Sequence, residues 1–453
     1  MSKIFGTDGA RGLANGFLTP ELAFRLGKAY THVLKKKGVK RPKFLVGMDS
    51  RKSGDMIQSA LSAGMMSMGA DVVVAGVIPT PAVAYLVKAR GFDCGATISA
   101  SHNPFYDNGI KFFQANGFKL EDAVELEIEN AYDNLGELVY PTNEDIGQYL
   151  CQDGFVADYA DSITSVTISG GEIISLKGLK IAVDCANGAT YEAAPKVFSD
   201  LGAEIFPINN CPDGVNINKN CGSTHLGQLI EYVKTHDVDL GIAFDGDGDR
   251  CLCIDENGQQ VDGDQIMSIL ANYMKDEGML KGDTVVATVM SNLGFFQMGE
   301  KYGLNVETTK VGDRYVLENM LENGYSLGGE QSGHIIFLDY STTGDGILTG
   351  AVLCGVLKKS GKKLSELNKY MTVLPQALIN AIVHPDKKYD YLSNQKVSEA
   401  VDKLTKKYES RGRVLIRPSG TEPLVRVMIE SDNQEEIEKD ARELADFIEQ
   451  ELK

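Results

Sequence analysis

Apolar residues near the start of the chain alternate between the spacing of strands and the spacing of helices. Residues 43–48 (KFLVGM), 70–76 (ADVVVAG) and 94–99 (CGATIS) are short apolar runs, which are typical of buried strands. Between them, residues 53–69 and 80–91 carry apolar side chains at helical spacing, and each stretch ends on a glycine. The pattern therefore predicts strand, helix, strand, helix and strand in this segment.

The same order of elements returns twice further along the chain. In the second pass the predicted strands are 179–184, 203–208 and 238–244, with one helix ending near Gly202 and another over 226–236. In the third pass the strands are 283–289, 304–309 and 325–329, with one helix ending at Gly303 and another over 312–324. Strands that alternate with helices indicate α/β layers. We therefore expect three quasi-equivalent α/β domains with mixed, largely parallel sheets.

The last part of the chain has a different pattern. Helical stretches at 394–412 and 433–453 flank the segment RVLIRPSGTEPLVRVMIES (413–431), which predicts two strands around a Ser-Gly-Thr turn. This indicates a smaller α+β fourth domain. The predicted boundaries are 1–150, 151–258, 259–370 and 371–453, with a hinge before the fourth domain in the segment 368–376.

Charge and cysteine content limit which partners and which cellular compartment are expected for this protein. The 453 residues carry a formal net charge of −18, so the surface as a whole does not attract nucleic acid or an anionic membrane. An anionic substrate would then need a local basic pocket. We see no signal peptide at the start, and the most apolar stretch, residues 70–87, reads as strand, turn and helix. Eight scattered cysteines without a Cys-x-x-Cys motif favour reduced thiols in the cytoplasm.

Unusual polar loops follow the third strand of each pass. They are SASHNP (99–104), DGDGDR (245–250) and GGEQSGH (328–334). Ligands of open α/β sheets bind beyond the carboxyl ends of the strands, so three loops at equivalent positions are expected to line one central cleft. The fourth domain adds RPSGTEP (417–423).

The DGDGDR loop is a candidate metal site. It places Asp245, Asp247 and Asp249 at alternate positions, and their oxygen ligands suit Mg²⁺ or Ca²⁺. An EF-hand Ca²⁺-binding module would place Glu256 at its twelfth position, but Arg250 then stands where the loop needs glycine. A dehalogenase-like phosphatase would use Asp245 as its nucleophile. A solvated acidic turn is the simplest alternative.

The remaining polar residues have ordinary explanations when taken singly. The RPSGTEP loop offers Arg417 and a Ser-Gly-Thr turn to a phosphate, but it also fits a plain β-turn. Ser101 is by default a turn residue, and we do not expect His102 beside it to face it. Lys111 would by default be a solvated or strand-edge lysine. Phosphoryl transfer would unite these parts, because a serine oxygen carries a phosphoryl group while a divalent ion and arginines neutralise it.

Five motifs resemble, in order, those of the α-D-phosphohexomutase superfamily. They are FGTDGARG (5–12), TISASHNP (97–104), DGDGDR (245–250), GEQSGH (329–334) and RPSGTEP (417–423). The family fold, with three α/β domains and a smaller α+β domain around a central cleft, agrees with the pattern described above.

The resemblance implies a role for each motif. Ser101 would be the phosphoserine and Lys111 would assist proton transfer, with Arg11, Arg250 and His334 as further catalytic residues. Mg²⁺ would bind to Asp245, Asp247, Asp249 and the phosphate on Ser101. The implied substrate-binding residues are His102, Glu330, Ser332, Arg417, Ser419, Gly420, Thr421 and Arg426.

Within the superfamily the chain is most similar to the bacterial branch that acts on glucosamine phosphates, on the segments KVGDRYV (310–316) and GGEQSGH. Phosphomannomutase/phosphoglucomutase enzymes, the alternative branch, typically have Gly-His where Gly312-Asp313 stands here. The implied reaction interconverts glucosamine 6-phosphate and glucosamine 1-phosphate through a 1,6-bisphosphate that turns round in the cleft. A hexosamine or glucose 1,6-bisphosphate is the expected activator. A homodimer, and a kinase or bisphosphate donor that first phosphorylates Ser101, are further expectations.

Overall fold

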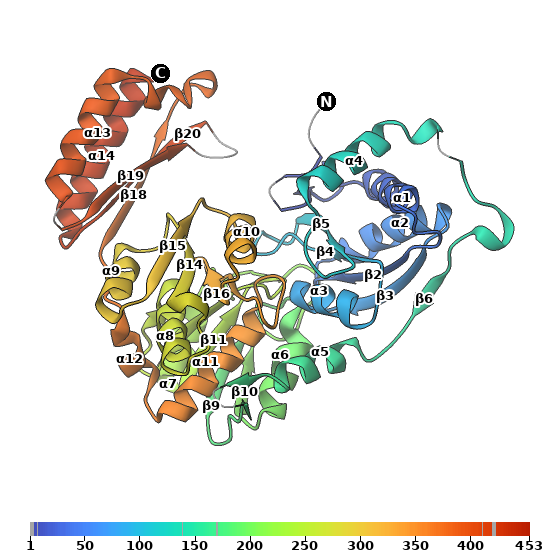
Figure 1. Cartoon of the computed structure of the whole chain (residues 1–453), viewed down its shortest axis with the longest axis horizontal. Coiled ribbons are helices and arrows are strands. Elements are labelled where there is room, and N and C mark those ends of the chain that lie inside the picture. Colours follow the sequence, from blue (N-terminus) through green and yellow to red (C-terminus); the bar gives the residue numbers. More distant parts are fainter. Residues whose placement is uncertain (1–3, 7, 138, 169–170, 410, 419–422) are drawn as a thin grey trace. The chain divides into compact units, whose positions relative to one another are not determined.

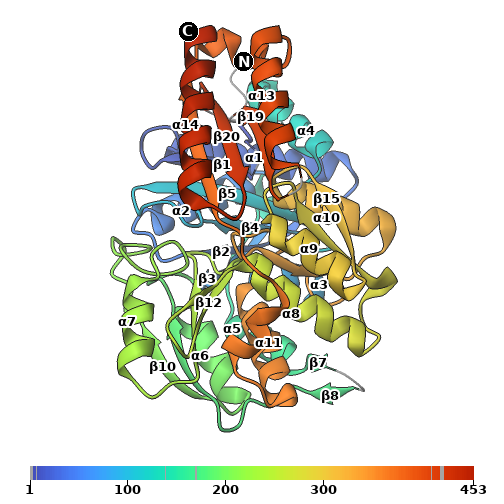
Figure 2. The same cartoon turned by 90° about the vertical axis from the view of Figure 1, so that its left-hand side faces the viewer.

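The computed structural model describes residues 4–6, 8–137, 139–168, 171–409, 411–418 and 423–453. The chain divides into two compact units, which we describe separately. Unit 1 comprises Met1–Val289 and Leu304–Lys369, and unit 2 comprises Met290–Gly303 and Tyr370–Lys453. Figures 1 and 2 follow the chain through both units. The four domain boundaries expected from the sequence stay predictions.

The first sheet of unit 1 is mixed and largely parallel. Its strands are β1 (Ala10–Leu13), β2 (Lys43–Met48), β3 (Asp71–Val77), β4 (Cys94–Ile98), β5 (Asp107–Gln114) and β6 (Tyr149–Cys151), in the order β1-β5-β4-β2-β3-β6. Strand β2 pairs in parallel with β3 and β4, whereas β5 is antiparallel to both β4 and β1. Helices α1 (Pro20–Lys36), α2 (Gly54–Ser67) and α4 (Asp122–Asp133) cover one face, and α3 (Thr80–Ala89) covers the other (Figure 1).

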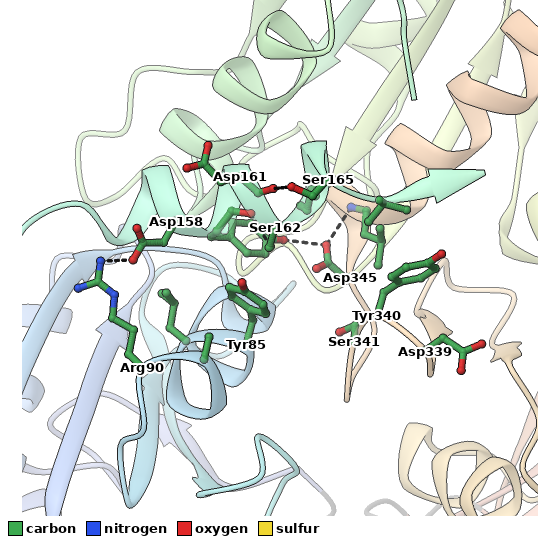
Figure 3. A pocket seen from close by; sticks show the side chains of 16 residues that line it. Tyr85, Arg90, Asp158, Asp161, Ser162, Ser165, Asp339, Tyr340, Ser341 and Asp345 are labelled. Atoms are coloured by element: carbon green, nitrogen blue, oxygen red, sulfur yellow. Dashed lines mark hydrogen bonds and ion pairs between the residues drawn. The ribbon is translucent and has the colours of Figure 1, made fainter. Parts of the chain in front are cut away.

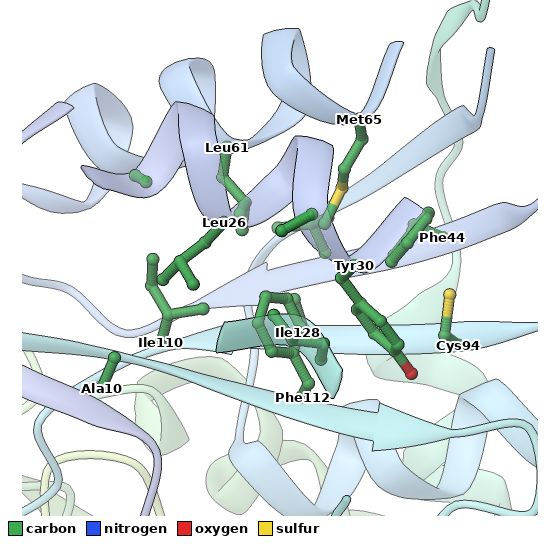
Figure 4. Close-up of a cluster of buried hydrophobic side chains, with 14 of the residues drawn as sticks. Ala10, Leu26, Tyr30, Phe44, Leu61, Met65, Cys94, Ile110, Phe112 and Ile128 are labelled. Atoms are coloured by element: carbon green, nitrogen blue, oxygen red, sulfur yellow. The ribbon is translucent and has the colours of Figure 1, made fainter. Parts of the chain in front are cut away.

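Alternation along the strands produces the two faces of this sheet. Phe44 and Val46 belong to the apolar cluster beneath α1 and α2, which Figure 4 shows around Tyr30 and Phe112. Gly64 lets α1 and α2 approach closely, because a Cβ at this position would lie 2.0 Å from the carbonyl oxygen of Phe24. Any larger residue would push the two helices apart and disrupt this close packing.

Two further sheets complete unit 1. The second contains β9 (Lys180–Asp184), β10 (Glu204–Ile208), β11 (Leu240–Phe244), β12 (Cys251–Asp255) and β13 (Gln260–Val261), in the order β10-β9-β11-β12-β13. The third contains β14 (Thr284–Thr288), β15 (Asn305–Thr309), β16 (Leu327–Gly329) and β17 (Ile335–Phe337), in the order β15-β14-β16-β17. The accompanying helices are α5 (Phe155–Thr164), α6 (Thr190–Asp200), α7 (Gly227–Thr235), α8 (Gly263–Asp276), α10 (Asp313–Asn323), α11 (Gly346–Ser360) and α12 (Leu364–Leu367), and β7 (Thr167–Ile168) pairs with β8 (Glu172–Ile173).

All three sheets reverse direction at the same point. The last parallel strand of each pass, β4, β11 or β16, is followed by an antiparallel neighbour, β5, β12 or β17. The polar loops identified in the sequence are these three connections. The prediction of three α/β layers with mixed, largely parallel sheets is confirmed, and the reversals explain why the loops are equivalent.

Unit 2 has the predicted α+β character. Strands β18 (Gln376–Ile382), β19 (Arg413–Pro418) and β20 (Leu424–Glu430) form an antiparallel sheet in the order β18-β20-β19, with helices α13 (Gln395–Tyr408) and α14 (Gln434–Glu451). Helix α9 (Leu293–Tyr302) joins this unit, since Glu430 accepts a hydrogen bond from the backbone of Leu293. Across the described residues, no helix combines the length and the apolar character needed to cross a membrane.

Candidate active site

Ser101 lies at the turn that follows β4. Its φ is 51°, in the left-handed region, and its side chain is buried. Ser101 Oγ donates a hydrogen bond to Asp245 Oδ2 at 2.6 Å, and the nearest ring nitrogen of His102 lies 3.3 Å from the same hydroxyl. The expectation that His102 does not face Ser101 is therefore wrong, because the left-handed backbone turns the two side chains together. Burial and the cations of Arg250 and Arg11 lower the pKa of His102 to about 4, so its ring is neutral at pH 7.

The three aspartates of the DGDGDR loop converge. One oxygen of each of Asp245, Asp247 and Asp249 lies within 4.8 Å of the others, and all three side chains are buried. The loop connects two antiparallel strands, β11 and β12, which excludes the helix-flanked EF-hand. Glu256 points to the same conclusion, because it accepts a hydrogen bond from Ser365 instead.

This cluster fits a divalent cation. Burial and repulsion by Asp249 and Asp247 raise the pKa of Asp245 well above its usual value. Asp247 Oδ1 and Asp249 Oδ1 are buried and have no hydrogen-bond partner among the described residues. Buried carboxylates that repel one another and leave oxygens free are suited to Mg²⁺, which prefers hard oxygen ligands.

Lys111 is buried beside these aspartates. Its Nζ lies 2.9 Å from Asp247 Oδ2 and 3.2 Å from Asp8 Oδ2. Burial alone would lower the pKa of Lys111, but the neighbouring Asp247 and Asp8 carboxylates raise it above its usual value. The side chain is therefore a fixed ammonium and not the solvated lysine that was the default expectation.

Ion pairs at the site close into a ring of ionisable groups. Carboxylates alternate with lysine or histidine side chains around it, in the order Asp249, Lys111, Asp8, Lys119, Asp313, His334 and back to Asp249. Its members come from all three α/β passes. Lys119 bridges Asp8 at 2.7 Å and Asp313 at 2.5 Å.

Sequence reasoning did not assign Asp8, Lys119 or Asp313 to the site. The sequence offered a signal for two of them. Asp8 lies inside the FGTDGARG motif, and Asp313 is the position at which the two branches of the superfamily differ. Lys119 lies in an unremarkable stretch, GFKL, and only its contacts reveal it.

The GEQSGH connection contributes His334 to this ring. Its Nδ1 faces Asp249 Oδ2 at 3.5 Å, and Nε2 accepts a hydrogen bond from the Gly344 N–H at 3.0 Å. Burial opposes protonation, but Asp249 and Asp313 raise the pKa of His334 above its usual value. Nε2 can accept from the Gly344 N–H only in the neutral ring that carries its proton on Nδ1. Protonation of Nε2 would therefore break this hydrogen bond.

Glu330 and Ser332 also lie in this connection. Glu330 Oε1 accepts a hydrogen bond from the Gly312 N–H at 3.1 Å, and Ser332 Oγ is buried without a partner among the described residues. These oxygens are groups of the kind that hold sugar hydroxyls.

Two arginines of the first and second passes add positive charge. Arg11 pairs with Asp8, and the Arg250 backbone N–H donates to Asp245 Oδ1 at 3.2 Å. The Nε atoms of Arg11 and Arg250 are buried and have no hydrogen-bond partner in the described part of the chain, although Arg250 Nε lies 3.9 Å from Asp249 Oδ1. Guanidinium donors that make no hydrogen bond within the protein suit the oxygens of a phosphoryl group.

In unit 2, Arg417 and Arg426 lie directly opposite each other on β19 and β20. Burial and the neighbouring Arg426 cation lower the pKa of Arg417 from its usual value. Two adjacent guanidinium groups are suited to binding an anion. The predicted ligands Ser419, Gly420 and Thr421 lie outside the described residues.

A separate cavity of about 580 Å³ lies in unit 1 between α3, α5 and the segment 339–345 (Figure 3). Arg90 pairs with Asp158 on its wall, and the hydroxyl of Tyr159 donates a hydrogen bond to Asp345 at 2.7 Å. Burial raises the pKa of Asp345 to about 6. None of the predicted site residues is among the described residues that line this cavity.

Family comparisons cover nearly the whole chain. Models of phosphoglucomutase/phosphomannomutase match in four parts: alpha/beta/alpha domain I at residues 2–138, domain II at 157–258, domain III at 262–373 and the C-terminal domain at 378–447. Phosphoglucosamine mutases of Acetivibrio thermocellus and Caldicellulosiruptor saccharolyticus are 56% and 55% identical, over 100% of this chain and of their own.

Solved structures with the same fold are more distant in sequence. A phosphoglucomutase/phosphomannomutase family protein of Burkholderia thailandensis has a TM-score of 0.80 at 23% identity, covering 99% of this chain and 98% of its own. N-acetylphosphoglucosamine mutase of Aspergillus fumigatus, in complex with GlcNAc-6P and magnesium, has a TM-score of 0.68 at 18% identity, covering 99% and 96%. The chain belongs to the phosphoglucomutase/phosphomannomutase family.

Proposed function

We propose that this enzyme interconverts glucosamine 6-phosphate and glucosamine 1-phosphate through a phosphoserine at Ser101. The observation that carries the proposal is the contact of Ser101 Oγ with Asp245 at 2.6 Å, at the point where the loops of the three passes meet. Full-length identity of 56% to a phosphoglucosamine mutase supports the substrate.

The first step moves the phosphoryl group from Ser101 Oγ to the 1-hydroxyl of glucosamine 6-phosphate. The Oγ–P bond breaks, a P–O1 bond forms, and the product is a 1,6-bisphosphate. The proton lost by the sugar hydroxyl must reach Ser101 Oγ. We assign this transfer to Lys111, whose ammonium is held among the aspartates by Asp247 and Asp8. It gives a proton to Ser101 Oγ as the Oγ–P bond breaks, and the amine so formed takes the proton of the sugar 1-hydroxyl.

The second step is the same exchange at the other end of the sugar. The bisphosphate turns in the site, the 6-phosphoryl group returns to Ser101 Oγ, and glucosamine 1-phosphate leaves. A fraction of bisphosphate lost to solvent would leave Ser101 unphosphorylated. A hexosamine or glucose 1,6-bisphosphate would then restore the phosphoserine as activator.

Charge neutralisation accounts for the rest of the site. Asp245, Asp247 and Asp249 would hold Mg²⁺, which when bound withdraws charge from the phosphoryl oxygens. Arg11 and Arg250 offer to the same oxygens their Nε donors, which have no hydrogen-bond partner among the described residues. His102 and the oxygens of Glu330 and Ser332 contact the sugar.

The phosphate that is not reacting needs its own anchor. Arg417 and Arg426 provide it, together with Ser419, Gly420 and Thr421 as predicted from the sequence. Because the sugar turns between steps, this anchor receives the 6-phosphate in one step and the 1-phosphate in the other. A homodimer, a cytoplasmic location and a kinase or bisphosphate donor for Ser101 remain predictions from the sequence.

A coupled assay with glucosamine, glucose and mannose 6-phosphates tests the proposal. Glucosamine 6-phosphate should have the highest kcat/KM. Glucose 6-phosphate should be rejected by a factor on the order of one hundred or more but still react, because an amine and a hydroxyl both form hydrogen bonds. Equal or better turnover of mannose 6-phosphate would contradict the assignment and favour a phosphomannomutase.

A further inference from the structure

The carbonyl oxygen of Ser101 is held from two sides. Ser101 has a φ of 51°, a conformation that non-glycine residues adopt only when their surroundings enforce it. Its backbone N–H donates to Ser99 Oγ at 2.9 Å. Its carbonyl oxygen accepts hydrogen bonds from Arg51 Nη2 at 2.7 Å and from Asn218 Nδ2 at 2.9 Å.

Arg51 supplies the first side, from the same α/β pass as Ser101. Its buried guanidinium pairs with Asp49 and also donates to the carbonyl oxygens of Asn103 at 2.9 Å and Asp107 at 3.1 Å. It therefore holds the whole turn from Ser101 to Asp107. Removing it would leave Asp49 as an unpaired buried charge, so its loss would damage the fold itself.

Asn218 supplies the second side, from the second α/β pass. Its own φ is 57°, and its backbone N–H donates to the Ala186 carbonyl oxygen at 2.9 Å. Its buried side chain reaches across to the first pass, where Nδ2 donates to the carbonyl oxygens of Ser101 and, at 3.1 Å, of Asn103.

The metal loop meets the turn at this same carbonyl oxygen. A Cβ at Gly246 would lie 2.6 Å from the Ser101 carbonyl oxygen and 2.7 Å from Asn218 Nδ2. Gly246 separates Asp245 from Asp247. Gly246 thus packs directly against the Ser101 carbonyl oxygen and the Asn218 amide. No space is left there for even a methyl group.

Other contacts hold the two passes together at this place. The Lys52 N–H donates to the Gly214 carbonyl oxygen at 2.8 Å, and Ser50 Oγ donates to the Asn187 carbonyl oxygen at 2.5 Å. These contacts do not touch Ser101. The fold therefore does not depend on Asn218 for this interface, and what its amide adds is the orientation of the Ser101 peptide.

We propose that Asn218 is a positioning residue for phosphoryl transfer, and that its amide acts through the Ser101 carbonyl oxygen to aim the Ser101 side chain at the three aspartates. The inference rests on the proposed function, in which Ser101 carries the phosphoryl group. A nucleophile misplaced by about 1 Å loses on the order of a hundredfold in rate, which is the scale of effect that such a residue controls.

Two matched variants test the inference. Asn218→Gly removes the amide and keeps the left-handed backbone free of strain, because glycine adopts it readily. Asn220→Gly is the control, since Asn220 lies in the same loop with a φ of 55° and an exposed side chain. Asn218→Gly should lower kcat by about 10- to 100-fold with KM changed by less than about threefold, whereas Asn220→Gly should leave both near the wild-type values.

A third variant and a second readout separate orientation from packing. Asn218→Asp preserves the size of the side chain but lacks the donor, so it should lose at least as much kcat as Asn218→Gly. In both Asn218 variants, the single-turnover rate of phosphoryl transfer from glucose 1,6-bisphosphate to Ser101 should fall by the same factor as kcat, with melting temperatures close to that of Asn220→Gly.

Wild-type activity makes the two possible failures distinguishable. A wild-type enzyme without mutase activity would overturn the proposed function, and with it the premise of this inference. An active wild type, together with Asn218→Gly or Asn218→Asp that retain its kcat, would overturn the role of Asn218 and leave the proposed function standing.

Discussion

Ser101 and Asp245 are 144 positions apart in the chain, and the hydroxyl of the first donates a 2.6 Å hydrogen bond to the carboxylate of the second. Asp245 directly follows β11 and Ser101 is the third residue after β4, and each of these strands is followed by an antiparallel neighbour. The contact therefore joins the corresponding connections of two α/β passes. It places the proposed phosphoryl acceptor against the proposed metal ligands.

We predict that the covalent phosphate is on Ser101. An acid-stable phosphate should map to a peptide that contains Ser101, and Ser101→Ala should lack both this phosphate and mutase activity. Intact mass before and after phosphatase treatment detects the phosphate, and peptide mapping then locates it. A hydroxylamine-labile phosphate on Asp245 would contradict the prediction and favour the dehalogenase-like chemistry.

Mg²⁺ should bind more tightly to the phosphorylated enzyme than to the dephosphorylated one, because the phosphate adds an anionic ligand to the three aspartates. Equilibrium titration of both forms measures the difference, and chelation should abolish activity until Mg²⁺ is restored. Asp247→Asn should weaken binding in both forms, whereas Asp237→Asn, at an exposed carboxylate, should not. Equal affinity of the two forms would argue against the phosphate as a ligand.

Arg417→Ala should weaken the grip on the phosphate that is not reacting. Losing a charge-assisted hydrogen bond costs about 1.5–3 kcal/mol, so kcat/KM should fall by at least roughly 10- to 150-fold. The slow hydrolysis of phospho-Ser101 by water needs no sugar, so it should be nearly unchanged in Arg417→Ala and strongly changed in Asp245→Ala. Arg411→Ala, which removes a partly exposed arginine of the same unit, is the matched control. If Arg417→Ala alters hydrolysis as much as Asp245→Ala does, Arg417 is not a remote anchor.

Lys119→Met should destabilise the fold, because it leaves Asp8 and Asp313 without their shared cation. Breaking a fully buried ion pair on one side costs about 3–5 kcal/mol, and these partly buried side chains should lose only a part of that. Lys37→Met, which breaks an exposed pair with Glu127, should cost less than about 1 kcal/mol. Melting temperatures of the two variants give the comparison. Adding Asp313→Asn to Lys119→Met should recover part of the loss, and a fully additive double variant would contradict the ring.

Asp345→Asn should stabilise the enzyme above about pH 6. Burial raises the pKa of Asp345 from 3.8 to about 6, so the fold favours its protonated form. The preference for the protonated carboxyl group stabilises the folded state fully below pH 3.8. This contribution to the free energy of unfolding is lost as the pH rises through about 6. The difference corresponds to about 3 kcal/mol, and asparagine avoids the loss because it stays neutral.

Melting temperatures of Asp345→Asn and wild type, measured between pH 4 and pH 8, should diverge as the pH rises. Asp161→Asn, at an exposed carboxylate on the same cavity, should show no such divergence. A constant difference across the pH range would mean that Asp345 keeps its ordinary pKa.

The strands and helices of the three passes could be predicted from sequence because each depends on a local pattern of apolar residues. The candidate site could be predicted only where a motif marks it, as at Ser101 and the three aspartates. Lys119, Arg51 and Asn218 have no such mark, since their partners lie far away in the chain and no periodicity relates them. The contact of His102 with Ser101 was missed for another reason. It depends on the left-handed backbone of Ser101, which the neighbouring sequence does not predict.

The reversal of each sheet after its last parallel strand also limits how this enzyme can change in evolution. The loops 99–106, 245–250 and 330–334 are each anchored at both ends by strands that are hydrogen-bonded to one another. An inserted residue would shift the register of a strand pair or displace a ligand, and one step of register turns every side chain of a strand to the opposite face. New substrates are therefore expected to arise by exchange of side chains at fixed loop length, and not by lengthening these loops.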